Sequence, residues 1–184
     1  MASAFAIRHA AHQIRRGGII VYPTETVYGL GCDPMNFDAV DALCRLKQRP
    51  SSKGLILLAS DLQLFDDYIE PLSEKDQQKI TGPSQPTSWI VRASKQLPDW
   101  LSNEQRTLAI RITEQPVVTA LCQHLGHPIV STSANPSGKR TCRNAFEAHK
   151  YFHGKVAAIL INDRELHGQP SIIRRLDDES VVRP

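Results

Sequence analysis

A cluster of basic residues between positions 47 and 54 gives the clearest chemical signal in this sequence. The segment reads Lys47-Gln48-Arg49-Pro50-Ser51-Ser52-Lys53-Gly54 and contains three cations and no acid. Lysine and arginine bind phosphate oxygens through charge and hydrogen bonds. The residue types therefore predict a site for a polyanion. A solvated basic turn is the alternative, because cations are also favoured near the C-terminus of a helix.

Two predicted elements hold the basic segment at its ends. Residues 36–47 predict a helix, because Asn36 is a good N-cap and apolar residues follow at helical spacing. Pro50 is expected to end the helix and to stiffen the turn. Residues 54–59 form a continuous apolar run, which predicts a strand buried on both faces. A connection anchored in this way is a common place for functional residues.

Two polar segments follow other predicted strands. Pro23–Asp33 comes after a strand at 19–22, and Ser131–Gly138 comes after the apolar residues 128–130. Both segments present small hydroxyl and amide groups, which donate to phosphate or carboxylate without taking much space. Together with the basic segment, they predict a polar site assembled from three places in the chain.

These segments resemble the motifs of the YrdC/TsaC family, the threonylcarbamoyl-AMP synthases that begin threonylcarbamoyladenosine modification of tRNA. Family members show a Pro-Thr-(Asp/Glu)-Thr-x-(Tyr/Phe)-Gly-(Leu/Val) turn, a Lys-x-Arg-Pro-x-x-Lys-Gly loop, an Ala-x-Arg strand and a Ser-Thr-Ser-Ala-Asn segment. This chain has them in order at Pro23–Leu30, Lys47–Gly54, Ala109–Arg111 and Ser131–Asn135. The resemblance implies a single YrdC-like domain over residues 1–184. It also implies an α/β fold with a twisted, mostly buried sheet, flanking helices and a concave, positively charged groove.

The resemblance implies roles for the matching residues. The residues that it assigns to the ATP phosphates and to catalysis are Lys47, Arg49 and Lys53. Those assigned to the threonine substrate are Thr24, Arg111 and Ser131, with the Arg111 guanidinium paired to the carboxylate. Those assigned to the rest of the nucleotide site are Thr87, Ser133 and Asn135.

The implied reaction condenses L-threonine, bicarbonate and ATP to threonylcarbamoyl-AMP and pyrophosphate. The threonine amine would take up carbon dioxide to form a carbamate, whose oxygen attacks the α-phosphorus. Mg2+ would enter with ATP and share the phosphate charge, with no protein side chain expected to ligate it. The expected partners are these three substrates and downstream threonylcarbamoyl-transfer proteins, with tRNA or another RNA as a further candidate.

Two segments depart from the family pattern. Relatives carry Pro-Gly-Pro-x-Thr before a strand, whereas this chain reads Pro83-Ser84-Gln85-Pro86-Thr87. Thr87 is retained, and Ser84 is tolerated unless its backbone needs a positive φ or a close approach to ligand. The segment Ser171-Ile172-Ile173-Arg174 also differs from many relatives. A contact of Ser171 or Arg174 with the adenosine is therefore left open.

A second hypothesis is an RNA-binding or ribosome-assembly protein that keeps the fold without nucleotidyl transfer. The altered 83–87 loop and the basic stretch Lys139–Lys155, which has five cations and one acid, motivate it. A solvated basic helix face is the favoured explanation of the same stretch. A third hypothesis, a carbamoyl-transfer module, is disfavoured because the sequence contains no acylphosphatase-like or zinc-binding segment.

Composition narrows the class of protein. The 184 residues are 41% hydrophobic and 22% charged with a net charge of +3, which is typical of one globular domain and too weakly basic to indicate a nucleic-acid binder. No apolar run approaches the roughly 20 residues that span a bilayer. We therefore expect a cytoplasmic protein that does not bind membranes. The four cysteines form no Cys-x-x-Cys pair, so we expect reduced thiols and no zinc site.

Two glycine-containing segments resemble nucleotide-binding loops, but each lacks a glycine that the full motif requires. Gly138-Lys139-Arg140-Thr141 ends like a P-loop, but Ser133 stands where the first glycine should be. Gly29-Leu30-Gly31 begins like a dinucleotide fingerprint, but its third glycine position is Pro34. Phosphate binding is therefore expected to depend on side-chain cations.

The rest of the chain predicts alternating helices and strands. Ser3 is expected to cap a first helix, which Gly17-Gly18 closes. Further helices are predicted near 61–69, 72–80 and 116–125, and strands near 88–93, 107–113, 128–132 and 157–162. This mixture predicts an α/β domain with helices packed on a sheet.

Overall fold

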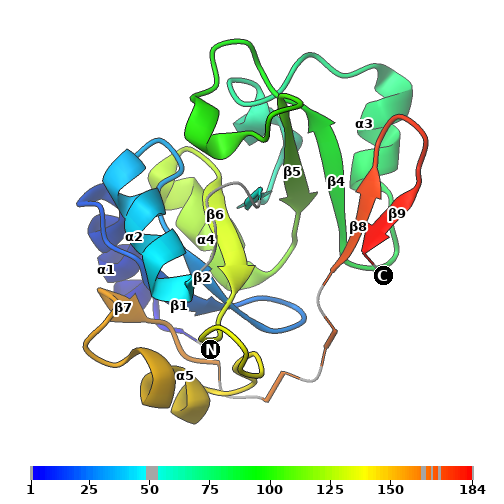
Figure 1. The fold of residues 1–184 in the computed structure, drawn as a ribbon. Coiled ribbons are helices and arrows are strands. Elements are labelled where there is room, and N and C mark those ends of the chain that lie inside the picture. The colour runs from blue at the N-terminus through cyan, green and yellow to red at the C-terminus, as the bar shows by residue number, and fades with distance from the viewer. Residues whose placement is uncertain (1, 49–53, 163–164, 167, 170, 184) are drawn as a thin grey trace.

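One mixed β-sheet organises the chain (Figure 1). The computed structural model describes residues 2–48, 54–162, 165–166, 168–169 and 171–183. Within these residues the sheet has nine strands in the order β7-β1-β2-β6-β3-β5-β4-β8-β9. The strands are β1 (Ile20–Pro23), β2 (Tyr28–Gly31), β3 (Ile56–Ala59), β4 (Thr87–Arg92), β5 (Thr107–Ile112), β6 (Ile129–Ser133), β7 (Ala158–Ile159), β8 (Ile172–Arg175) and β9 (Val181–Arg183).

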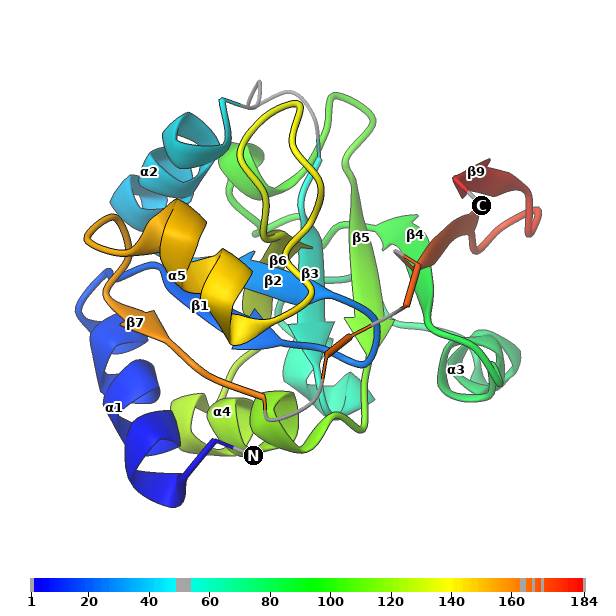
Figure 2. The ribbon, with the colours of Figure 1, turned by 90° about the horizontal axis from the view of Figure 1, so that it is seen from below.

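Helices flank this sheet (Figures 1 and 2). The α-helices are α1 (Ala4–Arg15), α2 (Phe37–Lys47), α3 (Glu74–Thr81), α4 (Pro116–Leu125) and α5 (Ala145–Phe152). Two 3-10 helices are η1 (Leu62–Phe65) and η2 (Asp99–Leu101). The helices α1 and α4 pack against each other and against β1, while α4 also contacts β3. The α/β class expected from the sequence is confirmed.

The predicted helix starts are present. The Ser3 hydroxyl accepts a hydrogen bond from the Ala6 N–H at 3.2 Å, and the Asn36 amide oxygen accepts one from the Ala39 N–H at 3.0 Å. The α2 helix ends at Lys47 because Gln48 adopts a left-handed conformation with φ of 49°. Pro50, which the sequence analysis named as the helix stop, lies outside the described residues.

The central strands have one core face and one partly open face. On β6, Val130 and Thr132 are buried, whereas Ser131 and Ser133 are only partly buried. Ile56 of β3 pairs with Ser131 on one side and with Ala109 of β5 on the other, so these three side chains share a face. Arg111 lies two residues after Ala109 and therefore projects from this same face. The alternation along β5 and β6 thus brings the predicted polar residues together.

Several predicted elements were wrong in extent or were missed. The expected helix at 61–69 is only the 3-10 helix η1, and Ile69 instead pairs with Ala93 in an isolated bridge. The expected strand at 157–162 is limited to Ala158–Ile159. The segment 28–31, which was interpreted as part of a turn, is the strand β2. The elements α5, β8 and β9 were not predicted individually.

All four cysteines are buried and unbridged. Burial raises the pKa of Cys122 to about 11 and the pKa of Cys142 to about 12, so both thiols stay protonated at neutral pH. Among the described residues, no group of three or more histidine, cysteine or carboxylate side chains is placed to hold a metal ion. None of the described helices has the length and apolar character needed to cross a bilayer.

Candidate functional site

A cavity of about 490 Å³ opens on the partly open face of the sheet. Its described lining comes from the 24–29 segment, from β3, β5 and β6, and from the C-terminal strands. Four residues predicted from the sequence line it, namely Thr24, Arg111, Ser131 and Ser133. The charged residues in this lining are Arg111 and Arg183. The structure therefore collects side chains that are far apart in the sequence around one concave space.

A larger cavity of about 720 Å³ lies elsewhere, between the segment 70–72, β4 and the end of β8. None of the sequence-predicted site residues is in its described lining. Its charged residues are of both signs, including Glu70, Arg92 and Asp177. The smaller cavity is the one lined by the residues predicted from the sequence, so we assign the candidate site to it despite its smaller volume.

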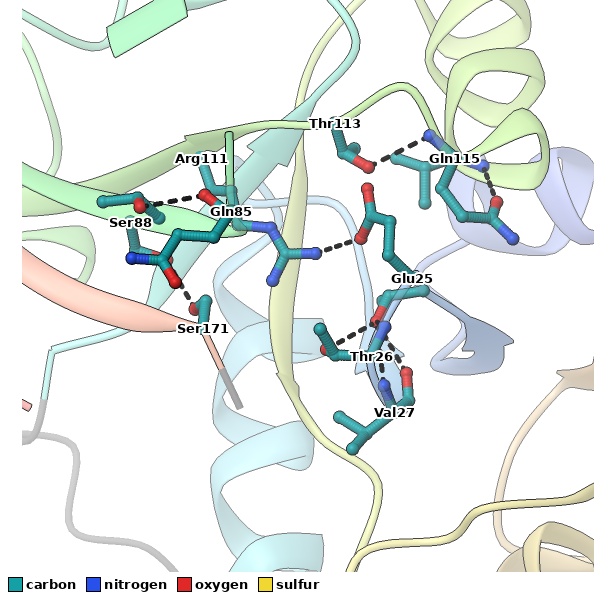
Figure 3. A network of polar contacts seen from close by, with 12 residues as sticks. Glu25, Thr26, Val27, Gln85, Ser88, Arg111, Thr113, Gln115 and Ser171 are labelled. Atoms are coloured by element: carbon teal, nitrogen blue, oxygen red, sulfur yellow. Dashed lines mark hydrogen bonds and ion pairs between the residues drawn. The ribbon is translucent and has the colours of Figure 1, made fainter. Parts of the chain in front are cut away.

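Arg111 is the most constrained charged group in the cavity. Only 6% of the residue is exposed, and its Nη2 atom is ion-paired with the Glu25 carboxylate (Figure 3). Its Nε–H is buried and has no hydrogen-bond partner among the described residues. An unpaired buried donor is unfavourable, so this edge of the guanidinium is suited to an incoming acceptor. A carboxylate matches that edge in charge and in shape.

Thr24 organises the turn that carries Glu25. Its hydroxyl donates to the Val27 carbonyl at 2.7 Å and accepts from the Thr26 and Val27 N–H groups at 3.3 Å. This is the local hydrogen bonding by which threonine stabilises tight turns. Figure 3 shows Glu25 extending from this turn toward Arg111. Thr24 therefore positions Glu25, and its predicted contact with threonine stays a prediction.

Lys47 is buried and anchors the end of β6. Its ammonium donates to the Ser133 carbonyl at 2.6 Å, the Asn135 carbonyl at 2.9 Å and the Asn135 side-chain oxygen at 2.7 Å. The Ser133 hydroxyl donates to the same Asn135 side-chain oxygen at 2.7 Å. The structure thus joins three predicted residues in one network. Neither Lys47 nor Asn135 is among the described lining of the cavity.

The other predicted residues are placed differently. Arg49 and Lys53 lie outside the described residues. Thr87 is buried, donates to the Gln85 carbonyl at 3.0 Å and is not in the described cavity lining. Ser84 is not among the described residues with a positive φ, so the backbone conformation there does not require the family glycine. Ser171 lines the cavity and hydrogen-bonds the buried Ser88 at 2.9 Å.

Tyr22 is a buried polar residue that the sequence analysis did not assign to the site. It is 0% exposed, and burial raises the pKa of its phenol, while the neighbouring Ser131 hydroxyl and the Arg111 charge act in the opposite direction. No hydrogen bond of normal geometry satisfies the phenol oxygen. Tyr22 pairs with Gly29, which in turn pairs with Ser133, so its ring shares the face of the cavity.

The glycines of β2 make room for this ring. A Cβ on Gly29 would lie 3.1 Å from the Tyr22 ring, and one on Gly31 would lie 2.8 Å from the ring and 2.5 Å from the Val130 carbonyl oxygen. The pattern Gly29-Leu30-Gly31 is therefore explained by packing. It lets an aromatic side chain cross a neighbouring strand toward the site.

We expect Gly31→Ala to lower the free energy of unfolding by about 1 to 3 kcal/mol, because the added methyl group overpacks against backbone. Urea unfolding of the variant and the parent protein measures this difference. Gly54→Ala is the matched control, since a Cβ at Gly54 meets nothing within 4 Å. Equal stability of Gly31→Ala and the parent would contradict the packing account.

Glu25 and Tyr22 are the main residues that sequence reasoning missed. Glu25 lies inside the quoted Pro23–Leu30 segment, and an acid beside two threonines in a turn was a signal that could have been followed. Its partner Arg111 is 86 positions away, so spacing could not reveal the pair. Tyr22 ends a predicted strand, where an aromatic side chain is ordinarily explained by the core.

Sequence comparisons match this chain over its whole length. The profile of the Sua5/YciO/YrdC family, described as telomere recombination, matches residues 12–184. A threonylcarbamoyl-AMP synthase of Pseudomonas putida (strain F1) is 42% identical over 186 residues, covering 100% of both chains. The protein of the same name from Pseudomonas aeruginosa (strain PAO1) is 41% identical over 185 residues, again covering 100% of both chains.

Solved structures have the same fold. P. abyssi Sua5 complexed with L-threonine superposes with a TM-score of 0.88 at 27% identity. The match covers 97% of this chain and 53% of that longer chain. E. coli YciO superposes with a TM-score of 0.82 at 28% identity, covering 96% of this chain and 87% of the other.

Proposed function

This chain belongs to the Sua5/YciO/YrdC family, and from that premise we propose that it is a threonylcarbamoyl-AMP synthase with ATP and L-threonine as substrates. Full-length relatives that are about two-fifths identical carry this name. Bicarbonate is the proposed third substrate, and pyrophosphate is the proposed second product. The reaction makes it a nucleotidyltransferase that acts in tRNA modification.

The single observation that carries this proposal is the buried Arg111 guanidinium in the cavity. No described group of the protein accepts from its Nε–H, so this donor can bind the carboxylate of a substrate. Hydroxyl groups of Ser131 and Ser133 line the same space and offer hydrogen bonds to a small polar substrate. A cavity of about 490 Å³ is in the range typical of small-molecule sites, roughly 300 to 1,000 Å³.

The proposed chemistry needs positioning more than a strong protein base. Bicarbonate takes up a proton and loses water to give carbon dioxide, and the threonine amine then adds to the carbon dioxide and loses a proton, which gives a carbamate. A carbamate oxygen then attacks the α-phosphorus of ATP, and the bond from that phosphorus to the bridging oxygen of pyrophosphate breaks. Carbamates are labile, so holding this one beside ATP and away from bulk water favours transfer over loss.

Cations would stabilise the charge that develops on pyrophosphate. We propose Arg49 and Lys53 for this role, and we propose that Lys47 acts by fixing the Ser133–Asn135 segment. Mg2+ would be held by the substrate phosphates and water, so no protein side chain is needed to ligate it. When bound, it would supply further positive charge at the phosphates.

Pyrophosphate release tests the proposed function directly. The protein is incubated with ATP, Mg2+, L-threonine and labelled bicarbonate, and each substrate is then omitted in turn. Release that requires threonine and bicarbonate, together with label in a nucleotide product, is the expected result. ATP binding without such release would overturn the proposal and favour the RNA-binding hypothesis, which the comparisons do not favour.

We expect Arg49→Ala and Lys53→Ala each to lower turnover more than about tenfold. The physical reason is the loss of a charged donor at the transferring phosphate, which typically costs about 2.7 to 4 kcal/mol of barrier. Initial rates of pyrophosphate release measure the effect. Arg45→Ala is the matched control, because Arg45 is an exposed cation on α2 whose partner is Asp41. Wild-type rates in both variants would refute the assignment.

RNA contact and transfer partners remain separate proposals. Lys139, Arg140 and Lys150 of the basic stretch are exposed, as a solvated helix face or an RNA surface would require. We propose that the product passes to a threonylcarbamoyl-transfer protein, because a labile mixed anhydride needs a nearby acceptor. We also propose a cytoplasmic location, where ATP and tRNA are available.

A further inference from the structure

The ion pair between Glu25 and Arg111 sets the charge at one edge of the candidate site. Arg111 is almost fully buried, whereas the Glu25 side chain is 32% exposed. Thr24 and Thr26, the neighbours of Glu25, both line the cavity. Glu25 itself is not in the described lining, so the pair lies across the cavity edge: Arg111 lines the cavity, and the Glu25 carboxylate lies beside it and is open to solvent.

We infer that Glu25 determines substrate specificity by recognising the α-ammonium group of the amino acid, next to the carboxylate held by Arg111. The inference rests on the proposed function, because it assigns the substrate of the same cavity. Recognition of the ammonium group by Glu25 would make the site bind an amino-acid zwitterion more tightly than a carboxylate without an amine. Glu25 acts here as a binding residue and takes no part in bond making.

The hydrogen-bonding capacity of both groups supports this assignment. Glu25 Oε2 accepts from Arg111 Nη2, which uses only part of the acceptor capacity of an ionised carboxylate. Its remaining lone pairs can accept from an ammonium group. Arg111 Nε has no partner and can donate to a second carboxylate. An α-amino acid carries these two complementary groups on adjacent atoms.

Charge balance leads to the same conclusion. A bound zwitterion leaves the neutral Glu25–Arg111 pair neutral, so no net charge is added beside the nearly buried Arg111. A carboxylate without an amine would leave one excess negative charge beside Glu25 and compete with it for Arg111. The other described cation of the lining, Arg183, is an exposed residue that donates to the Ser171 carbonyl at 2.8 Å. Solvent screens its charge more effectively than that of Arg111.

The matched ligands for the test are L-threonine and (R)-3-hydroxybutanoate, which is threonine without its amine. Binding of each is measured by calorimetry without ATP, for the full chain and for Glu25→Gln. We expect the variant to bind L-threonine about tenfold or more weakly, since a hydrogen bond to a charged group is lost. We expect it to bind 3-hydroxybutanoate more tightly, because the competing carboxylate is gone.

Two further variants keep the result interpretable. Glu25→Asp retains the charge and should retain the preference for L-threonine even if its affinity falls. Glu104→Gln changes net charge equally at an exposed position and should change neither affinity. A Glu25→Gln protein that is folded and keeps the parent preference would overturn this inference alone. A parent protein that binds neither ligand would overturn the proposed function and this inference together.

Discussion

Replacing Lys47 with methionine is expected to lower turnover about a hundredfold, because displacement of site residues by about 1 Å can have an effect of that size. The buried ammonium binds two carbonyl oxygens and one side-chain oxygen of Ser133 and Asn135. Methionine fills much of the same volume but donates no hydrogen bond. The segment that follows β6 would lose its anchor, and the hydroxyl of Ser133 would no longer be fixed at the cavity.

The same substitution should lower the free energy of unfolding by about 1.5 to 3 kcal/mol, the usual contribution of a hydrogen bond to a charged group. Urea unfolding and pyrophosphate release measure the two effects on one protein sample. Lys150→Met removes an exposed lysine on α5 and serves as the control. Lys47→Arg retains the charge but presents a planar fork in place of three diverging donors. High activity in Lys47→Arg would favour direct phosphate binding, and unchanged activity in Lys47→Met would refute both roles.

Arg111→Met should weaken L-threonine binding by about 2 to 5 kcal/mol, which is roughly thirtyfold or more, as expected on loss of a buried charged partner. The reason is that the Nε and Nη2 donors of the cavity disappear together. Stability should change much less than binding, because the Glu25 carboxylate left behind is 32% exposed and can be solvated. Calorimetry with threonine and a parallel urea titration separate these two effects.

A double variant sharpens this second prediction. Glu25→Gln combined with Arg111→Met removes both charges, so it should recover any stability lost by Arg111→Met alone. It should not recover threonine binding. ATP affinity provides the internal control, because Arg111 is assigned to the amino acid. Threonine binding at the parent affinity in Arg111→Met would exclude this cavity as the amino-acid site.

The sequence predicted the elements whose signals are local. The caps Ser3 and Asn36 and the apolar run at 54–59 each specify structure within a few residues, and the structure confirms them. The strand β2 was missed because its two glycines are poor strand formers. Their value comes from the Tyr22 ring on the adjacent strand, which no local pattern contains.

The sequence predicted which residues form the site, but it predicted only some of the contacts between them. Motif resemblance selected Arg111 and Ser131, and the structure places both in one cavity. The pairing of Arg111 with Glu25 depends on the strand order β2-β6-β3-β5, which brings together segments from distant parts of the chain. Lys47 was read as a phosphate ligand because cations near one another suggest an anion. Among the described residues it donates to oxygens of Ser133 and Asn135, and its predicted contact with phosphate stays a prediction.

The order of strands in the sheet also has a consequence for synthesis of the chain. The strands β7 and β8 are consecutive in sequence, yet β7 lies at one edge and β8 pairs with β4 toward the other (Figure 1). The connection between them crosses from one side to the other and is fastened on the way, where the Gly168 N–H donates to the Thr26 carbonyl. Because β8 follows β4 by about 80 residues, β4 keeps an unpaired edge until β8 has been synthesised and has docked. The hairpin of β8 and β9 therefore covers the β4 edge only after it has been synthesised, and until then that edge can pair with another chain.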